Sequence, residues 1–402
     1  MKKHHLTFFI GMCLLQLGAN MAHPVTPMYI STRGLTSSMF GYALAAAMTT
    51  QFLVAPLFGK LCNYVPTKRL MMIGGFGYAL GQFFFFLAHS DMAMLCARMF
   101  TGIPIGCVYT GCLNYVVNTS ADASERGKNL TIYATVQTVV SALGYFLGGM
   151  LGEISIETAL ISQIIMLASA ATVFTFLCID DTPFKHRPEQ PLRARDCNPL
   201  QSFIDVKHYA SKILILVFVI VAITNIGQST FEQEFNYYIM DHFGLTSKYN
   251  GTFKAMIALV SFVVNMTISM RLIRKTDIGR TILPIVLFST IPLGLILLFD
   301  AVVPFVVMDV TFYAFTAIRT PLLQALVSRS ADTRYSNNAM GFYQSMTSLG
   351  TLFGALFAGL LYAANIRLPF IFAFSAFVIA SIVTTYYVRV YKRRREETES
   401  GS

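Results

Sequence analysis

The stretch Gly34-Leu35-Thr36-Ser37 is followed four residues later by Gly41. It returns as Gly244-Leu245-Thr246-Ser247, again followed by a glycine (Gly251), at an offset of 210 residues. Each copy stands between two long apolar segments. A four-letter match can arise by chance, so it gains weight only if a second match shares its order and spacing.

A second match has the same order and nearly the same spacing. Leu143-Gly144, with Gly148, returns as Leu349-Gly350, with Gly354, at an offset of 206 residues. Both pairs fall at corresponding places in two runs of apolar segments. The chain therefore contains an internal repeat, in which the second half duplicates the membrane unit of the first. Duplicated membrane halves are typical of secondary transporters, whose substrate site lies at the interface between the repeats.

The composition is that of a helical membrane protein. Of the 402 residues 55% are hydrophobic and 12% are charged, against about 25% charged residues in a typical soluble domain. The apolar runs are long enough to cross a bilayer as helices and lack the alternation of a membrane barrel. Twelve transmembrane helices are predicted: 6–29, 39–61, 70–89, 92–117, 130–151, 158–179, 213–233, 249–270, 281–299, 302–327, 339–362 and 368–390.

These helices predict an all-α membrane protein built from two six-helix bundles. Residues 1–179 would form the first bundle and residues 213–390 the second. The polar, proline-rich stretch 180–212 would be a cytoplasmic linker with a short surface helix near 199–210. Residues 391–402 would be a disordered cytoplasmic tail.

The positions of the basic residues predict the orientation. Most of the 30 Lys and Arg residues fall in segments that share one side if both termini are cytoplasmic, as the positive-inside rule requires. The net charge of +10 therefore indicates anionic lipid headgroups rather than nucleic acid as the partner of these loops. We expect a multi-pass protein of the cytoplasmic membrane, without a cleaved signal peptide.

Several motifs carry a family resemblance. They are Pro24–Pro27 in the first helix, Gly59–Asn63 with Lys68 in the next loop, Arg98–Gly102 in the fourth helix and Gly144–Gly149 in the fifth. With them the whole chain resembles the major facilitator superfamily, and most closely its twelve-helix drug:proton antiporter branch. The resemblance implies two bundles that alternate around one central site, without a cofactor, in a protein that acts as a monomer.

The chain departs from this pattern at two places. Asn63 stands where the loop motif has Asp, and Tyr145 stands where the antiporter motif has Pro. The residues expected to serve the conformational change are Gly59, Asn63, Lys68, Gly102, Gly144, Gly148, Gly149, Gly350 and Gly354. The glycines permit close helix approach, which suits either sliding between halves or static packing.

Charges inside helices are candidates for function, because inserting one at a helix centre costs about 2.5–3.5 kcal/mol. Arg98 could bind an anionic or dipolar substrate, or be structural with Asn20 or Gln137 as polar partners. Asp309 could bind and release a proton, or lie near the interface and stay hydrated. Arg319 is about 15 Å of helical rise from Asp309, so each needs another partner; Arg319 is expected at a gate or interface in the cytoplasmic half.

Other polar residues are weaker candidates. Glu232 and Glu234 lie at the outer end of the seventh helix, where one could titrate or both could be hydrated. His23 could titrate near neutral pH or line a cavity, and Asn20 and Gln137 could do the latter. The seven cysteines show no CxxC pair and imply no metal or disulfide framework.

The sequence thus predicts a secondary transporter that moves a small organic solute by alternating access, with export coupled to proton entry. An uptake permease or facilitator for a sugar, carboxylate or similar nutrient is the alternative. A membrane enzyme or sensor is disfavoured, because the sequence shows no paired-His, Cys/His or nucleophile constellation.

Overall fold

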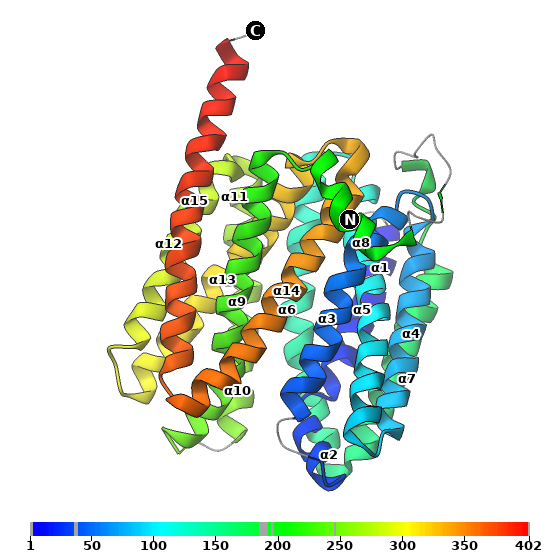
Figure 1. The fold of residues 1–402 in the computed structure, drawn as a ribbon, viewed down its shortest axis with the longest axis vertical. Coiled ribbons are helices and arrows are strands. Elements are labelled where there is room, and N and C mark those ends of the chain that lie inside the picture. The colour runs from blue at the N-terminus through cyan, green and yellow to red at the C-terminus, as the bar shows by residue number, and fades with distance from the viewer. Residues whose placement is uncertain (1–2, 36–38, 185–191, 194–196, 245–246, 401–402) are drawn as a thin grey trace.

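The computed structural model describes residues 3–35, 39–184, 192–193, 197–244 and 247–400. The elements of these residues are helical, and their long axes run nearly parallel (Figure 1). Eleven helices of the described chain are long and apolar enough to cross a membrane, and twelve if a bent pair at the N-terminus is counted as one span. The predicted twelve-helix, all-α fold is confirmed.

The first half of the chain is a bundle of seven helices that make six spans. Helix α1 packs against α6 and α7, while α5 packs against α3 and α4. The helices are α1 (Lys3–Met21), α2 (Thr26–Thr32), α3 (Met39–Leu61), α4 (Thr67–Leu87), α5 (Asp91–Thr119), α6 (Ala123–Ile154) and α7 (Ile156–Leu177).

The second half repeats this arrangement. Helix α9 packs against α14 and α15, while α13 packs against α10 and α12. The helices are α9 (Lys212–Asp241), α10 (Ser247–Val264), α11 (Met270–Lys275), α12 (Ile278–Ile296), α13 (Val302–Ser330), α14 (Ser336–Ala364) and α15 (Leu368–Ser400). A π-helical turn, Asn265–Ser269, joins α10 to α11 within one span. Between the halves the short helix α8 (Pro199–Asp205) falls in the predicted place.

The duplicated sequence has a structural counterpart. Gly34 and Gly244 open the two copies, and they adopt the same left-handed backbone conformation, with φ of 69° and 64°. A side chain is strained in that region, whereas glycine enters it freely. Residues 36–38 and 245–246 of the repeated strings lie outside the described residues.

Two expectations about the termini need correction. The first span is not one continuous helix: α1 and α2 are bent by 41°, at a turn that contains Pro24, whose missing N–H interrupts helical hydrogen bonding.

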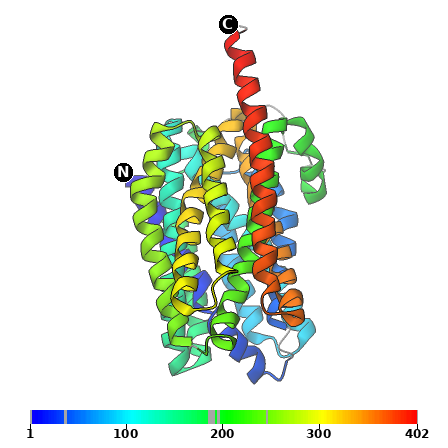
Figure 2. The ribbon, with the colours of Figure 1, turned by 90° about the vertical axis from the view of Figure 1, so that its left-hand side faces the viewer.

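The predicted disordered tail continues α15 as a helix beyond the bundle (Figure 2). Tyr391 Oη and Arg395 Nη1 hold it by donating to Asp277, at 3.0 and 2.9 Å.

The apolar core is distributed unevenly along the bundle axis. One large buried cluster contains residues of both halves, such as Tyr115, Leu130, Leu326 and Tyr343. Two further clusters each belong to a single half, one around Phe231 and Phe305 and one around Tyr29, Phe85 and Met94. The halves therefore share a core toward the end that carries both termini (Figure 1), and they have separate cores toward the other end.

Polar contacts reinforce the shared end. Asn63 Nδ2 on the α3–α4 turn donates to Asn338 Oδ1 at 2.6 Å, and Asn337 Nδ2 donates back to Asn63 Oδ1 at 2.9 Å. One turn earlier, a Cβ on Gly59 would lie 2.7 Å from the Cα of Gly341, so the backbones of α3 and α14 touch there. We call this set, Asn63, Asn337, Asn338, Gly59 and Gly341, the termini-side latch.

Other predicted motif residues lie within single halves. Gly144 and Gly148 of α6 pack against the backbone of α1, and Gly350 and Gly354 pack against α9 in the same way. These contacts are those that static packing predicts. Gly102 fits α5 against the backbone of α3, a Cβ on Gly149 would meet nothing within 4 Å, and Lys68 is half-buried in the first turn of α4.

Candidate functional site

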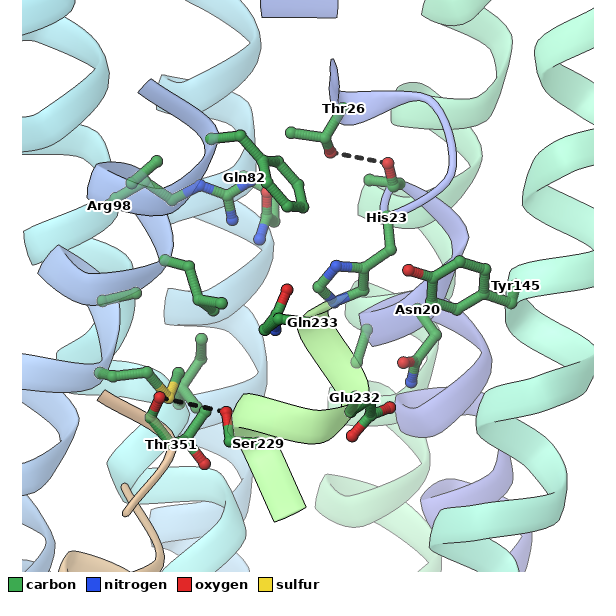
Figure 3. Close-up of a pocket in the computed structure, with 18 of the residues that line it drawn as sticks. Asn20, His23, Thr26, Gln82, Arg98, Tyr145, Ser229, Glu232, Gln233 and Thr351 are labelled. Atoms are coloured by element: carbon green, nitrogen blue, oxygen red, sulfur yellow. Dashed lines mark hydrogen bonds between the residues drawn. The ribbon is translucent and has the colours of Figure 1, made fainter. Parts of the chain in front are cut away.

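A cavity lies between the halves, on the side of the molecule away from the termini-side latch. It has two lobes of about 300 and 360 Å³, which is within the usual size range of ligand pockets. The first lobe is shown in Figure 3. Six residues line both lobes: Asn20, Tyr145, Asn225, Gln228, Glu232 and Lys254.

Arg98 enters the first lobe from α5. Its guanidinium stands 3.8 Å from the centre of the Phe85 ring, beside Gln82 (Figure 3). The polar partners expected for it are engaged elsewhere. Asn20 Nδ2 donates to Ser141 Oγ at 2.9 Å, and Gln137 Nε2 donates to Tyr133 Oη at 3.5 Å. Asn20 and Gln137 also line the cavity. The cationic guanidinium of Arg98 lies against the face of the Phe85 ring and lines the first lobe.

Arg319 lines the second lobe from α13. Its side chain is 1% exposed, and Nη2 donates to Gln228 Oε1. The guanidinium lies 5.1 Å from the centre of the Phe377 ring. Its other terminal nitrogen, Nη1, is buried without a hydrogen-bond partner among the described residues.

Asp309 lies in α13 one helical turn before Tyr313, which lines the second lobe. It is 0% exposed, and neither carboxyl oxygen has a hydrogen-bond partner within the described chain. The alternative of a hydrated carboxylate near the interface is therefore wrong for this conformation. Since burying an ionised, unpaired carboxylate costs several kcal/mol, we expect Asp309 to carry a proton here.

The two glutamates of α9 have different surroundings. Glu232 is exposed to the cavity and lines both lobes (Figure 3). Glu234 is 3% exposed and is absent from the lining of both lobes. Two residues along a helix turn the side chain by about 200°, so only Glu232 can meet a solute in the cavity.

Tyr145 forms a contact between the halves that the sequence did not predict. Lys254 Nζ of α10 lies 3.7 Å from the centre of the Tyr145 ring of α6. The ring of His23 is parallel to that of Tyr145, with centroids 5.7 Å apart (Figure 3). Tyr145 replaces the motif proline, a departure that could have drawn attention to this position, whereas Lys254 gave no such signal.

This arrangement defines a class of protein. Two helical halves enclose a polar, charged cavity, and they share a core on only one side of it. This is the architecture of a transporter that exposes one site alternately to the two faces of a membrane.

A family model described as Major Facilitator Superfamily matches residues 8–336 and 294–402, and the chain belongs to that family. Among its relatives, Multidrug resistance protein 2 of Bacillus subtilis (strain 168) is 24% identical over 386 residues, covering 95% of this chain and 93% of the relative. Quinolone resistance protein NorA of Staphylococcus aureus (strain MSSA476) is 22% identical over 405 residues, with 99% of each chain covered.

Two solved structures share the fold. The human organic anion transporter MFSD10 (TETRAN) superposes with a TM-score of 0.82 at 16% identity, over 95% of this chain and 99% of that one. The transporter FucP, in its outward conformation, superposes with a TM-score of 0.71 at 13% identity, over 95% and 98%.

Proposed function

We propose that this chain exports small organic solutes across the cytoplasmic membrane in exchange for protons, as a monomer with both termini in the cytoplasm. The names of the relatives, a multidrug resistance protein and a quinolone resistance protein, support export. Residues 1–179 and 213–390 would move as the two rigid halves, with 180–212 as a cytoplasmic linker. In that orientation the described conformation faces outward.

The observation that carries proton coupling is the carboxyl of Asp309, which is fully buried and has no hydrogen-bond partner among the described residues. Such a group can be neutral in this packing, and it can ionise only where water or a cation reaches it. If α13 is rehydrated when the halves rock, the carboxyl releases its proton to the other side. Glu232, which already faces the cavity, is the second carboxyl that we propose to take part in coupling.

The available energy suffices for concentrative export. One proton moving through a gradient of about one pH unit releases about 1.4 kcal/mol, and about 2.3 kcal/mol more across roughly 100 mV. The total, about 3.7 kcal/mol, supports a solute gradient of several hundredfold.

The direction of transport can be tested with membrane vesicles. Inside-out vesicles containing the chain, with an acidic interior, should accumulate at least one of two fluorescent dyes, rhodamine 110 and rhodamine 123, and collapsing the pH gradient should release it. Vesicles without the chain are the control. The alternative is an uptake permease for a nutrient such as a sugar or carboxylate, which the altered motif at Tyr145 favours. It predicts accumulation in right-side-out vesicles placed in acidic medium, and that result would contradict export.

A further inference from the structure

We propose that Arg319 is an oxyanion site, so that the solutes carried by this protein are organic molecules with a carboxylate or a comparable acidic group. This inference rests on the proposed transport function and names the substrate class of the same cavity. In the guanidinium of Arg319, one buried nitrogen has no hydrogen-bond partner among the described residues.

The guanidinium of Arg319 is built into the wall of the second lobe. Gln228 accepts from Nη2, and the ring of Phe377 lies against the group, so its plane is held in place. Nη1 has no hydrogen-bond partner in the described part of the chain, although the side chain is only 1% exposed. No carboxylate of the described residues lies within ion-pair distance of it.

An arginine in this position keeps its charge, because the guanidinium does not lose its proton in proteins. A buried charge is tolerated only when it is paired or hydrogen-bonded. Gln228 supplies one neutral acceptor, and Glu232, the carboxylate that lines the same lobe, forms no ion pair with Arg319. Carboxylates and phosphates match the planar donors of arginine best, so a solute oxyanion would supply what the wall lacks.

The rest of the cavity has the same charge preference. Its lining contributes three cationic side chains, Arg98, Lys254 and Arg319, against one carboxylate, Glu232. A purely cationic solute would meet net repulsion and leave Arg319 unpaired. A solute with an acidic group at Arg319 can place a cationic group near Glu232, since that residue lines both lobes, so zwitterions fit as well as anions.

The second lobe also suits a flat ring system. Tyr313 and Tyr343 line it together with Arg319, and the lobe encloses about 360 Å³. Aromatic faces favour planar solutes through stacking and dispersion. We therefore expect aromatic acids rather than small aliphatic acids to bind.

Two dyes with the same ring system test the acidic group directly. Rhodamine 110 has a free carboxylate, and rhodamine 123 is its methyl ester. For protein in lipid nanodiscs, fluorescence anisotropy should give at least tenfold tighter binding of the acid than of the ester. Arg319→Gln should abolish this preference by weakening the acid alone, Arg319→Lys should keep part of it, and the exposed-arginine control Arg334→Gln should keep it all.

Three results would overturn the proposal: equal affinity for acid and ester, no saturable binding of the acid, or an unchanged preference in folded Arg319→Gln. The comparison on unmodified protein needs no variant, so misfolding of Arg319→Gln cannot hide the answer. Transport in the same acid-inside vesicles separates this inference from the proposed function. Driven accumulation of the ester but not the acid refutes the substrate class alone, whereas no driven accumulation of either dye refutes both.

Discussion

Arg98 and Asp309 occupy the same position in two helices of equal length. Helices α5 and α13 each contain 29 residues, and they begin at residues 91 and 302, so both residues are eighth in their helix. One copy of the duplicated helix thus carries a base where the other carries an acid. Arg98 meets the cavity, whereas Asp309 is enclosed by the second half. We infer that a substrate-binding residue, Arg98, and a proton-binding residue, Asp309, occupy equivalent positions in the two halves.

The first prediction concerns Asp309. Asp309→Asn keeps the size of the side chain and cannot release a proton, so transport driven by a pH gradient should fall to the background of empty proteoliposomes. Equilibrium binding of the dye should change less than threefold. Asp300→Asn, which changes an exposed aspartate near the end of the loop before α13, is the matched control. Unchanged driven transport by Asp309→Asn would remove this residue from the mechanism.

The role of Arg98 in binding can be tested with one variant that removes the positive charge and one that keeps it. Arg98→Ala removes the cation on the Phe85 ring, a contact worth about 0.5–2 kcal/mol, and it removes a positive charge from the first lobe. We expect at least tenfold weaker binding of an acidic dye for Arg98→Ala and a smaller loss for Arg98→Lys, measured by anisotropy. Normal binding by both variants would show that Arg98 is structural.

The termini-side latch predicts a conformational effect. A methyl group at Gly59 would collide with the backbone of Gly341, so Gly59→Ala should favour the conformation in which this end is open. Cys62 is 0% exposed beside the latch, and its labelling by a maleimide, read by peptide mass spectrometry, should rise severalfold. Gly359→Ala lies on the same helix as Gly341, in open space, and should leave the labelling unchanged. Equal labelling in both variants would contradict the latch.

The amides of the latch should contribute stability. Asn63→Leu leaves the amide of Asn337, 4% exposed, without its acceptor, and a buried group left unsatisfied costs about 1–3 kcal/mol. We expect a lower unfolding temperature for Asn63→Leu, and a smaller decrease for Asn338→Ala, which removes one hydrogen bond. The order of the two variants in a thermal unfolding assay checks the assignment; a reversed order would speak against reciprocal bonding.

A last prediction concerns pH. The hydrogen bond from His242, at 2.5 Å, and the nearby Arg367 guanidinium, at 3.1 Å, hold the pKa of Asp300 below its ordinary value. A lowered pKa contributes stability above the ordinary pKa of about 3.8, which is lost as the pH falls through the lowered value. The difference in unfolding temperature between the unmodified protein and Asp300→Asn should be small near pH 6 and should shrink as the pH falls below the ordinary value of about 3.8. A difference that grows on acidification would contradict this contact.

Much of the fold followed from the sequence, because apolar length and repetition are local properties. The twelve spans and the linker helix near Pro199 are of this kind. The bend at Pro24 and the helical continuation of α15 were not predicted. The second depends on Asp277, more than a hundred residues away in the chain.

The cost of burying charge singled out Arg98, Asp309 and Arg319 from the sequence alone. It could not separate Glu232 from Glu234, place Arg319 in the cavity wall, or bring Lys254 to Tyr145. The direction in which a side chain points around its helix acquires meaning only when the neighbouring helices are in place. Hydropathy along the chain therefore determined which residues enter the membrane, whereas helix packing decided which of them face the cavity, a partner or the core.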